Sequence, residues 1–209
     1  MKYKWLNKED SNKKLILFFN GWGMDDNVVK HLNCDTYDVL MFYDYNFLDT
    51  DFDWNTLKTY AERNLIAWSM GVMIGSKYIN SDELSNSVAI NGTLKPINER
   101  FGIHPKIYDL TIKGFNEKSC KKFINSMFDN NTFTLDVFPT SRNLEEQVSE
   151  LIAIKNYTSN EDFKYNKIII SDSDKIIPTK SQTQYWGIEP NLNSGHCPFL
   201  QFNKWSELL

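Results

Sequence analysis

Residues 64–75, which have the sequence NLIAWSMGVMIG, decide the fold and suggest a site. A run of mainly apolar residues leads directly to Ser69, and residues 70–78 then carry apolar side chains at helical spacing. A strand, a sharp turn that carries a serine and a helix make up a nucleophile elbow, whose usual pattern is G-x-S-x-G. Here Ala67 stands in place of the first glycine, and Gly71 is the second. The alternative is a buried strand–turn–helix in which Ser69 only caps the helix.

Length and composition indicate one globular domain with at most an insertion. The chain has 209 residues, of which 41% are hydrophobic, and its net charge of −4 argues against a nucleic-acid binder driven by basicity. The three cysteines, Cys34, Cys120 and Cys197, are odd in number, far apart and form no C-x-x-C pair. They therefore predict neither a disulfide framework nor a zinc site, and free thiols fit a reducing compartment.

The N-terminal region lacks the pattern of a secretion signal. Its strongest apolar run covers only residues 15–19, which is shorter than the apolar core of a signal peptide. No apolar segment approaches the length of a membrane span. We therefore expect a cytoplasmic protein that has no membrane partner.

Strand and helix patterns alternate along the chain. Short apolar or β-branched runs predict strands, an edge strand and turn are expected near the N-terminus, and helical spacing predicts helices that are few or short. The predicted strands are residues 15–19, 37–45, 64–68, 87–91 and 167–170, the edge strand and turn lie within 5–14, and the predicted helices are 25–32, 55–63, 70–78 and 202–209. This alternation predicts an α/β fold with a mostly parallel central sheet.

The pattern changes between Gly92 and Asn166. Residues 119–128 and 143–156 have helical periodicity, and no strand pattern there is as clear as the earlier ones. We expect a core of residues 1–94 and 166–209, into which residues 95–165 are inserted as an α-helical lid.

A histidine base is predicted from its position in the chain. A serine nucleophile needs a base, a carboxylate that orients the base, and two donors for the oxyanion. In α/β-hydrolases the order is nucleophile, acid, histidine, and only His196 follows the last predicted core strand. His31 is expected to be exposed, and His104, at the start of the lid, could touch a substrate. The alternative for His196 is an ordinary surface-loop histidine.

The acid and the oxyanion donors are predicted from the loops that follow strands. Residues 171–178, SDSDKIIP, offer Asp174, whose spacing to the proline fits better, and Asp172 as the fallback; the alternative is a solvated turn. The loop at residues 20–23, NGWG, follows an early strand, and its glycines permit positive φ. The predicted oxyanion donors are the backbone N–H groups of Trp22 and Met70.

Five motifs together resemble the BioG family of pimeloyl-[acyl-carrier protein] methyl ester esterases, and the resemblance extends over nearly the whole chain. They are NGWG at 20–23, AWSMG at 67–71, INGT at 90–93 with Pro96, FGI at 101–103 and GHCPF at 195–199. The resemblance implies an atypical α/β-hydrolase core with few flanking helices and a helical lid. It also implies hydrolysis of the methyl ester of pimeloyl-ACP in bacterial biotin synthesis, without a cofactor. Ser69 would be the nucleophile, His196 the base, Asp174 the acid, and Trp22 and Met70 the oxyanion donors.

The implied substrate has an apolar chain and an acidic carrier protein. Aromatic and apolar side chains that could line its tunnel are Trp22, Trp68, Phe123, Met127 and Phe128, although each could equally be a core residue. Residues 95–122 carry seven basic and three acidic side chains, a local charge of +4. Lys113, Lys121 and Lys122 are candidates for docking the carrier protein, and a solvated lysine-rich surface is the alternative. No long heptad pattern is present, so we expect a monomer.

Two other interpretations stay open at this point. The same catalytic residues would serve a general short-chain carboxylesterase or an acyl-ACP thioesterase, because only the pocket and lid discriminate between substrates. A non-catalytic hydrolase-like protein that binds a ligand or a partner is the alternative of another class.

Overall fold

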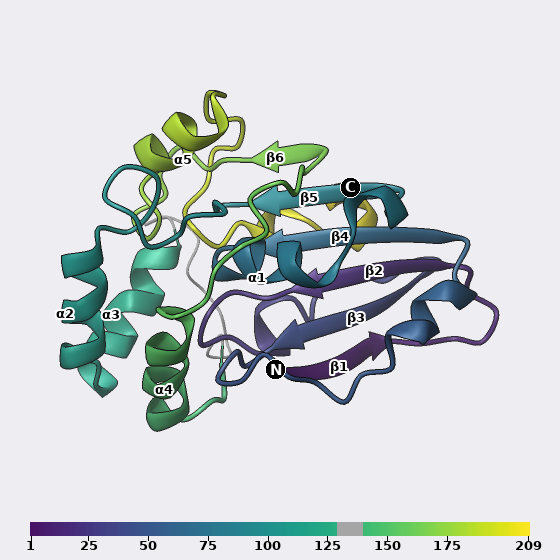
Figure 1. Cartoon of the computed structure of the whole chain (residues 1–209), viewed down its shortest axis with the longest axis horizontal. Coiled ribbons are helices and arrows are strands. Elements are labelled where there is room, and N and C mark those ends of the chain that lie inside the picture. The colour runs from purple at the N-terminus through teal and green to yellow at the C-terminus, as the bar shows by residue number, and fades with distance from the viewer. Residues whose placement is uncertain (129–139) are drawn as a thin grey trace.

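A mostly parallel β-sheet forms the core of the molecule (Figure 1). In the computed structural model, which describes residues 1–128 and 140–209, this sheet has six strands in the order β1-β3-β2-β4-β5-β6. Strand β1 pairs antiparallel with β3 at one edge, and the other pairs are parallel. The strands are β1 Lys2–Asn7, β2 Lys14–Phe19, β3 Tyr37–Tyr43, β4 Glu62–Trp68, β5 Asn86–Ile90 and β6 Lys167–Ile169.

The central strands carry continuous apolar runs because both faces of the sheet are covered. Leu15, Leu17 and Phe19 of β2 belong to a core on one face, and Ile16 and Phe18 belong to a second core on the other face. Successive side chains of a strand point to opposite faces, so a strand buried on both sides has no polar alternation. This explains why residues 15–19 form a continuous apolar run.

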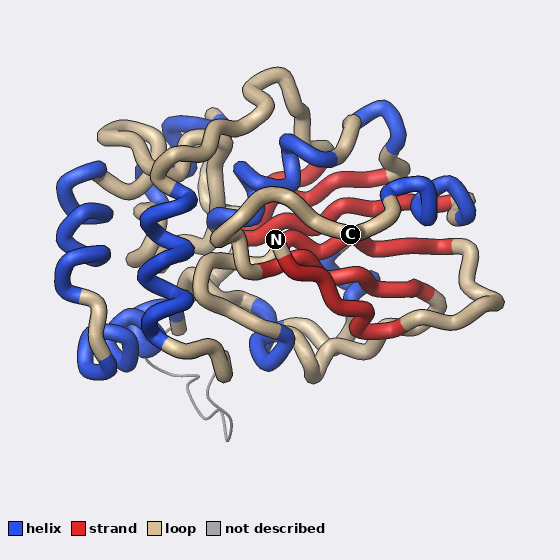
Figure 2. The backbone as a smooth tube through the Cα atoms, turned by 60° about the horizontal axis from the view of Figure 1, so that its bottom comes forward, coloured by secondary structure: helices blue, strands red, loops and turns tan. Residues whose placement is uncertain are grey.

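Few α-helices flank the sheet. Helix α1, Met70–Tyr78, packs on one face of the sheet, where its apolar side chains belong to the same hydrophobic core as side chains of β2 and β4. Three helices gather beside the end of the sheet at which β2 to β5 finish, and α5 lies next to β6 (Figures 1 and 2). They are α2 Pro105–Gly114, α3 Glu117–Met127, α4 Leu144–Ile154 and α5 Thr179–Trp186. No helix formed by the described residues has the length and apolar character needed to cross a membrane.

The predicted α/β class with a mostly parallel sheet is confirmed, and the local differences have physical causes. The edge strand begins at Lys2, earlier than expected, because its backbone pairs with β3. The predicted helices at 25–32 and 202–209 are 3-10 turns at Asp26–Val28 and Trp205–Leu208. Residues 129–139 of the predicted lid lie outside the described residues.

Two helices, α2 and α5, were not expected from the sequence. Helix α2 begins with Pro105 in its first turn, and the His104 side chain accepts a hydrogen bond from the Lys106 N–H. Proline at this position is a recognisable start signal that could have predicted α2. Helix α5 ends at Gly187, which adopts the left-handed conformation with φ of +70°.

We expect Gly71→Ala to destabilise the protein strongly. A Cβ on Gly71 would lie 2.2 Å from the Phe19 carbonyl oxygen, which is backbone of the central strand β2 and cannot move aside. The free energy of unfolding, measured by urea denaturation, should fall by about 3 kcal/mol. Gly114→Ala is the matched control, because a Cβ at the end of α2 meets nothing within 4 Å, and its effect should stay below about 1 kcal/mol. A wild-type midpoint for Gly71→Ala would contradict this close approach.

Candidate active site

Ser69 occupies the sharp turn between β4 and α1. Its backbone has φ of +58° and ψ of −123°, a conformation that non-glycine residues rarely adopt. The neighbouring strand β5 stabilises this turn, because the Ser69 N–H donates a hydrogen bond to the Ile90 carbonyl over 2.9 Å. Gly92 also packs so closely that a Cβ there would lie 2.5 Å from the Ser69 carbonyl oxygen. This is the geometry of a nucleophile elbow.

The structure brings Ser69, His196 and Asp174 into one hydrogen-bonded chain. The Nε2 atom of His196 lies 2.8 Å from the Ser69 Oγ, and its Nδ1 atom lies 2.7 Å from the Asp174 Oδ2. All three residues are buried. With the carboxylate accepting the proton of Nδ1, the lone pair of Nε2 faces the serine hydroxyl. This arrangement can remove the hydroxyl proton of Ser69.

The structure places Asp174, rather than the fallback Asp172, against the histidine. The Asp174 Oδ1 accepts the backbone N–H groups of Ile176 and Ile177 over 2.8 and 3.1 Å. Its Oδ2 accepts a hydrogen bond from the side-chain amide of Gln182 over 2.8 Å, in addition to the hydrogen bond with the Nδ1 of His196. Asp172 is exposed, and its carboxylate accepts the Ser194 N–H over 3.3 Å. The side chain of Asp174 is therefore held in place by three other donors.

The histidine loop is anchored through the His196 carbonyl. This oxygen accepts hydrogen bonds from the Trp68 indole N–H over 2.8 Å and from the Asn91 side-chain amide over 2.9 Å. Asn91 also has a positive φ of +47° and exchanges two hydrogen bonds with Ser171, which lies on the acid loop. Neither Asn91 nor Gln182 was expected from the sequence to have an anchoring role. Asn91 carried a signal in the INGT motif, whereas Gln182 lies on α5, which was not predicted.

Two residues predicted to supply oxyanion donors lie beside the space in front of the serine. Trp22 and Met70 both line the same cavity as Ser69 and His196. On either side of Trp22, the Gly21 N–H donates to the Asn20 Oδ1 and the Gly23 N–H donates to the Glu150 carboxylate. The Trp22 side chain is held separately, because its indole N–H donates to the Gln147 carbonyl over 2.8 Å.

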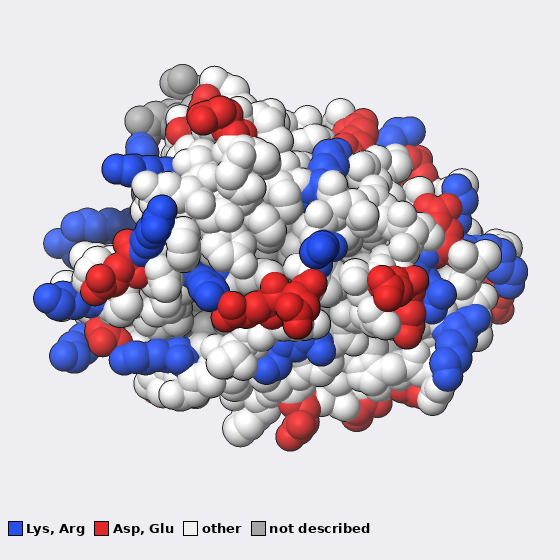
Figure 3. Space-filling view, turned by 45° about the horizontal axis from the view of Figure 1, so that its top comes forward, with Lys and Arg blue, Asp and Glu red and all other residues white. Residues whose placement is uncertain are grey.

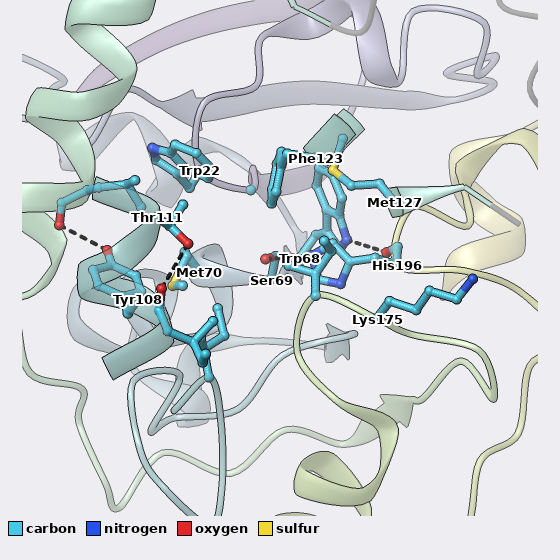
Figure 4. Close-up of a pocket in the computed structure, with 15 residues that line it drawn as sticks. Trp22, Trp68, Ser69, Met70, Tyr108, Thr111, Phe123, Met127, Lys175 and His196 are labelled. Carbon is cyan, nitrogen blue, oxygen red and sulfur yellow. Dashed lines mark hydrogen bonds between the residues drawn. The ribbon is translucent and has the colours of Figure 1, made fainter. Parts of the chain in front are cut away.

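The cavity above Ser69 has a volume of about 140 Å³ and is mainly apolar. Figure 4 shows Ser69 in the middle of its lining, with Trp68 and His196 on one side and Met70 and Tyr108 on the other. The lining residues are Gly21, Trp22, Trp68, Ser69, Met70, Ile103, Ile107, Tyr108, Thr111, Phe123, Met127, Leu151, Lys175, Ile176 and His196. The Tyr108 hydroxyl donates to the Leu151 carbonyl, and burial raises its pKa, so the hydroxyl stays neutral.

The tunnel and lid residues named from the sequence lie in the cavity lining, in a hydrophobic core or on the surface. Trp22, Trp68, Phe123 and Met127 line the cavity, and Phe128 packs instead in a core that contacts the sheet. Lys113, Lys121 and Lys122 lie exposed on α2 and α3. His104 is not part of the lining, because it caps α2. The lining residues of α2 were missed because that helix was not predicted.

No group of His, Cys, Asp and Glu side chains in the described parts of the chain is arranged to hold a metal ion. The Ser69–His196–Asp174 chain, beside backbone amides and an apolar cavity, can transfer an acyl group to the serine and then to water.

We expect the Cys197 thiol, next to His196 in the chain, to be unreactive in the native protein. Burial raises its pKa to about 12, and only the thiolate is nucleophilic, so its alkylation should become fast only as the pH approaches that value. Cys34 is half-buried and serves as the internal comparison. Peptide mass spectrometry after N-ethylmaleimide treatment at pH 8 should find Cys34 labelled before Cys197. Equal labelling rates would show that the histidine loop opens readily.

Solved structures place this fold in a known class. The esterase EaEST from Exiguobacterium antarcticum shares 15% identity with a TM-score of 0.67, and the alignment covers 91% of this chain and 87% of that one. The enol-lactonase from Burkholderia xenovorans LB400 shares 14% identity with a TM-score of 0.69, over 96% of this chain and 90% of that one. At such low identity the likeness concerns the fold alone. The fold is that of the α/β-hydrolases.

Sequence similarity is more specific. The family described as "Pimeloyl-ACP methyl esterase BioG" matches residues 1–208. The crystal structure of BioG from Haemophilus influenzae shares 32% identity with a TM-score of 0.88, over 100% of this chain and 99% of that one. The chain belongs to the BioG family.

A curated relative carries a different name. The malonyl-[acyl-carrier protein] O-methyltransferase of Bacteroides fragilis (strain 638R) is 38% identical over 182 residues. The alignment covers 83% of this chain and 36% of that protein. The chain thus spans little more than a third of the relative's length.

Proposed function

We propose that this protein is a serine esterase that hydrolyses the methyl ester of pimeloyl-[acyl-carrier protein] to pimeloyl-ACP and methanol during biotin biosynthesis. The observation that carries the proposal is the hydrogen-bonded chain of Ser69, His196 and Asp174 beneath an apolar cavity. Membership of the BioG family supports the substrate.

In the proposed mechanism Ser69 attacks the ester carbonyl while the Nε2 of His196 takes its proton. The Trp22 and Met70 amides stabilise the oxyanion, and Asp174 stabilises the imidazolium. Collapse of the tetrahedral intermediate breaks the bond to methoxide, which takes the proton from His196 and leaves as methanol. A water then gives its proton to His196 and attacks the pimeloyl-serine ester. When the second tetrahedral intermediate collapses, His196 returns this proton to the Ser69 Oγ and the carboxylic acid is released. Each step uses groups of the chain itself.

Methyl transfer is not proposed for this chain, although a relative is named for it. The similarity covers 36% of that relative, so most of its length lies outside the matching region. A serine activated by a histidine and a carboxylate suits acyl transfer to water, and removal of a methyl group as methanol is the reverse of what a carboxyl methyltransferase does.

We propose that residues 95–165 form the lid over a core of residues 1–94 and 166–209, and that the acyl arm enters between α2 and α3. A groove of about 470 Å³ between these helices is lined in part by Ile107, Thr111 and Phe123, which also line the cavity over Ser69. Ile107 and Leu110 expose 56% and 62% of their surface there, which is unusual for large apolar side chains. An apolar groove continuous with the cavity suits an acyl chain on its phosphopantetheine arm.

The charge around this groove suits an acidic carrier protein. Blue side chains outnumber red ones at the end of the molecule where α2 and α3 lie (Figure 3). Among the described residues no ion pair involves Lys113, Lys121 or Lys122. Asp109 of α2 is neutralised by Lys155, 2.6 Å away. Exposed lysines of this kind can steer an acidic partner toward the groove.

We expect the double variant Lys121→Glu/Lys122→Glu to raise KM for methyl-pimeloyl-ACP about tenfold, because it puts two like charges against the carrier. KM for a small methyl ester should stay unchanged, since both residues lie on the surface. The difference should shrink in high salt. Equal changes for both substrates, in steady-state assays side by side, would contradict docking at α3.

The decisive test is methanol release from methyl-pimeloyl-ACP by purified protein, compared with a small free methyl ester. Preferential release from the carrier-bound ester supports the proposal. Equal rates would instead indicate a general short-chain carboxylesterase, and release of the acyl group from the carrier would indicate a thioesterase. A fluorophosphonate probe that fails to label Ser69 would indicate a non-catalytic binding protein.

A further inference from the structure

Glu150 is a fully buried carboxylate on α4 whose side chain is hydrogen-bonded to the loop that carries Trp22. Its Oε1 accepts the Tyr45 N–H over 2.8 Å, and its Oε2 accepts the Gly23 N–H over 3.1 Å. The Oε2 atom also pairs with the guanidinium of Arg142. The desolvation cost of a buried carboxylate has to be offset by hydrogen bonds and a counter-charge. One of the hydrogen bonds that Glu150 accepts comes from the loop beside the serine.

We propose that Glu150 and Arg142 are positioning residues that hold the Trp22 amide in place as the oxyanion donor; this inference rests on the proposed esterase function. Gly23 directly follows Trp22, so the bond to Glu150 fixes the peptide unit on one side of the donor. The peptide unit that contains the Trp22 N–H is fixed on the other side, where the Gly21 carbonyl accepts the Met24 N–H over 3.3 Å.

Helix α4 holds the same loop at a second point. The Trp22 indole donates to the carbonyl of Gln147, which lies one turn before Glu150 on α4. The ring also packs edge-on against Phe115 and Phe123, with centroids 5.1 and 4.9 Å away. Backbone and side chain of the oxyanion loop are thus both tied to a helix of the proposed lid. The loop cannot shift relative to α4 without breaking both bonds.

Arg142 has an electrostatic task in this arrangement. An ionised carboxylate without a counter-charge, bound to the loop that carries an oxyanion donor, would repel the negative charge that develops on the oxyanion in the transition state. The Arg142 side chain, only 5% exposed, lies between the carboxylates of Glu150 and Asp44, the latter 3.0 Å away. Burial raises the pKa of Glu150, and Arg142 together with the two backbone donors opposes that rise. The pair therefore anchors the loop without leaving an uncompensated charge beside the site.

The test compares Glu150→Gln with the matched control Glu146→Gln. Glutamine has one oxygen where the carboxylate has two, so it cannot accept both backbone N–H groups, and its NH2 would face a donor. Glu146 lies on the same helix, also faces Arg142, at 4.0 Å, but is 43% exposed and does not hold the loop. The rate of p-nitrophenyl acetate hydrolysis is divided by the concentration of active sites, which is measured as the amount of protein that a fluorophosphonate labels. Misfolded protein therefore does not lower the rate per active site.

We expect Glu150→Gln to lower kcat about 30-fold or more with KM nearly unchanged, because only transition-state stabilisation is lost. Inhibition by an alkylboronic acid, which forms a tetrahedral anion on Ser69, should weaken in the same proportion. Glu146→Gln should match the wild type in both measurements. Wild-type kcat and boronate affinity per labelled site in Glu150→Gln would overturn the proposal, whatever the variant's melting temperature.

Three further variants keep the proposal testable if Glu150→Gln folds poorly. Glu150→Asp keeps the charge beside Arg142 but shortens the reach to Gly23, and it should lose kcat and boronate affinity together. Arg142→Gln alone should lower kcat further than Arg142→Gln/Glu150→Gln, because the single variant leaves a buried charge beside the oxyanion. The reverse order, or wild-type kcat in Glu150→Asp, would overturn it.

Failure of this inference differs from failure of the proposed function. Hydrolysis of p-nitrophenyl acetate but not of methyl-pimeloyl-ACP would overturn the substrate and leave the positioning role to be decided by the variants above. A wild-type protein that hydrolyses neither ester would overturn both.

Discussion

Ser69→Ala should lower kcat/KM for the methyl ester by at least about 10⁴-fold and leave the fold intact. The hydroxyl lies 2.8 Å from the Nε2 of His196, and no other nucleophile of the cavity lining has a histidine so placed. Alanine adopts the same positive φ as serine at a similar strain, so the free energy of unfolding should change by less than about 1 kcal/mol. Methanol release and urea denaturation measure the two quantities.

The control for this variant is Ser76→Ala. Ser76 is also a buried serine and lies on the helix that follows the elbow, but its hydroxyl donates to the Met73 carbonyl over 2.7 Å. It should keep wild-type turnover. Substantial turnover in Ser69→Ala, or equal losses in both variants, would show that the elbow serine is not the nucleophile.

Asp174→Asn should lower kcat by about 10⁴-fold. The asparagine amide N–H₂ cannot accept the proton of Nδ1, so the imidazole is driven to the tautomer that carries its proton on Nε2. That nitrogen then cannot take the proton of Ser69, although every heavy atom stays close to its place. The same side-chain size and the remaining acceptor for the Ile176 and Ile177 N–H groups should preserve the fold.

Asp172→Asn is the matched control, two residues earlier in the same loop. Its side chain is exposed and contacts the Ser194 backbone rather than the imidazole, so kcat should stay within about threefold of the wild type. Measuring kcat for both variants with a small ester decides between the two acids. A larger loss in Asp172→Asn would show that Asp172 is the functional partner of His196.

Much of the fold was predictable because it is encoded locally. Residues 15–19 and 65–68 are apolar on both faces, which predicts buried parallel strands, and both segments are strands. Helices α3 and α4 of the proposed lid were visible as periodicity, whereas α2 was missed although Pro105 marks its start. The 3-10 turns near both ends were predicted as helices, because periodicity does not report how many turns tertiary packing allows.

The elbow, the acid loop and the loop at residues 20–23 could be named from the sequence by itself, because each follows a predicted strand and parallel strands finish at one edge of a sheet. The histidine was named from its position after the last predicted core strand. Which aspartate faces His196, how Gln182 and Asn91 hold the two loops, and how Glu150 reaches Gly23 were decided only by the tertiary structure. These contacts join residues up to 127 positions apart. Local periodicity and turn residues predict where strands, helices and loops lie along the chain. They do not predict which distant side chain a loop contacts once the helices have packed.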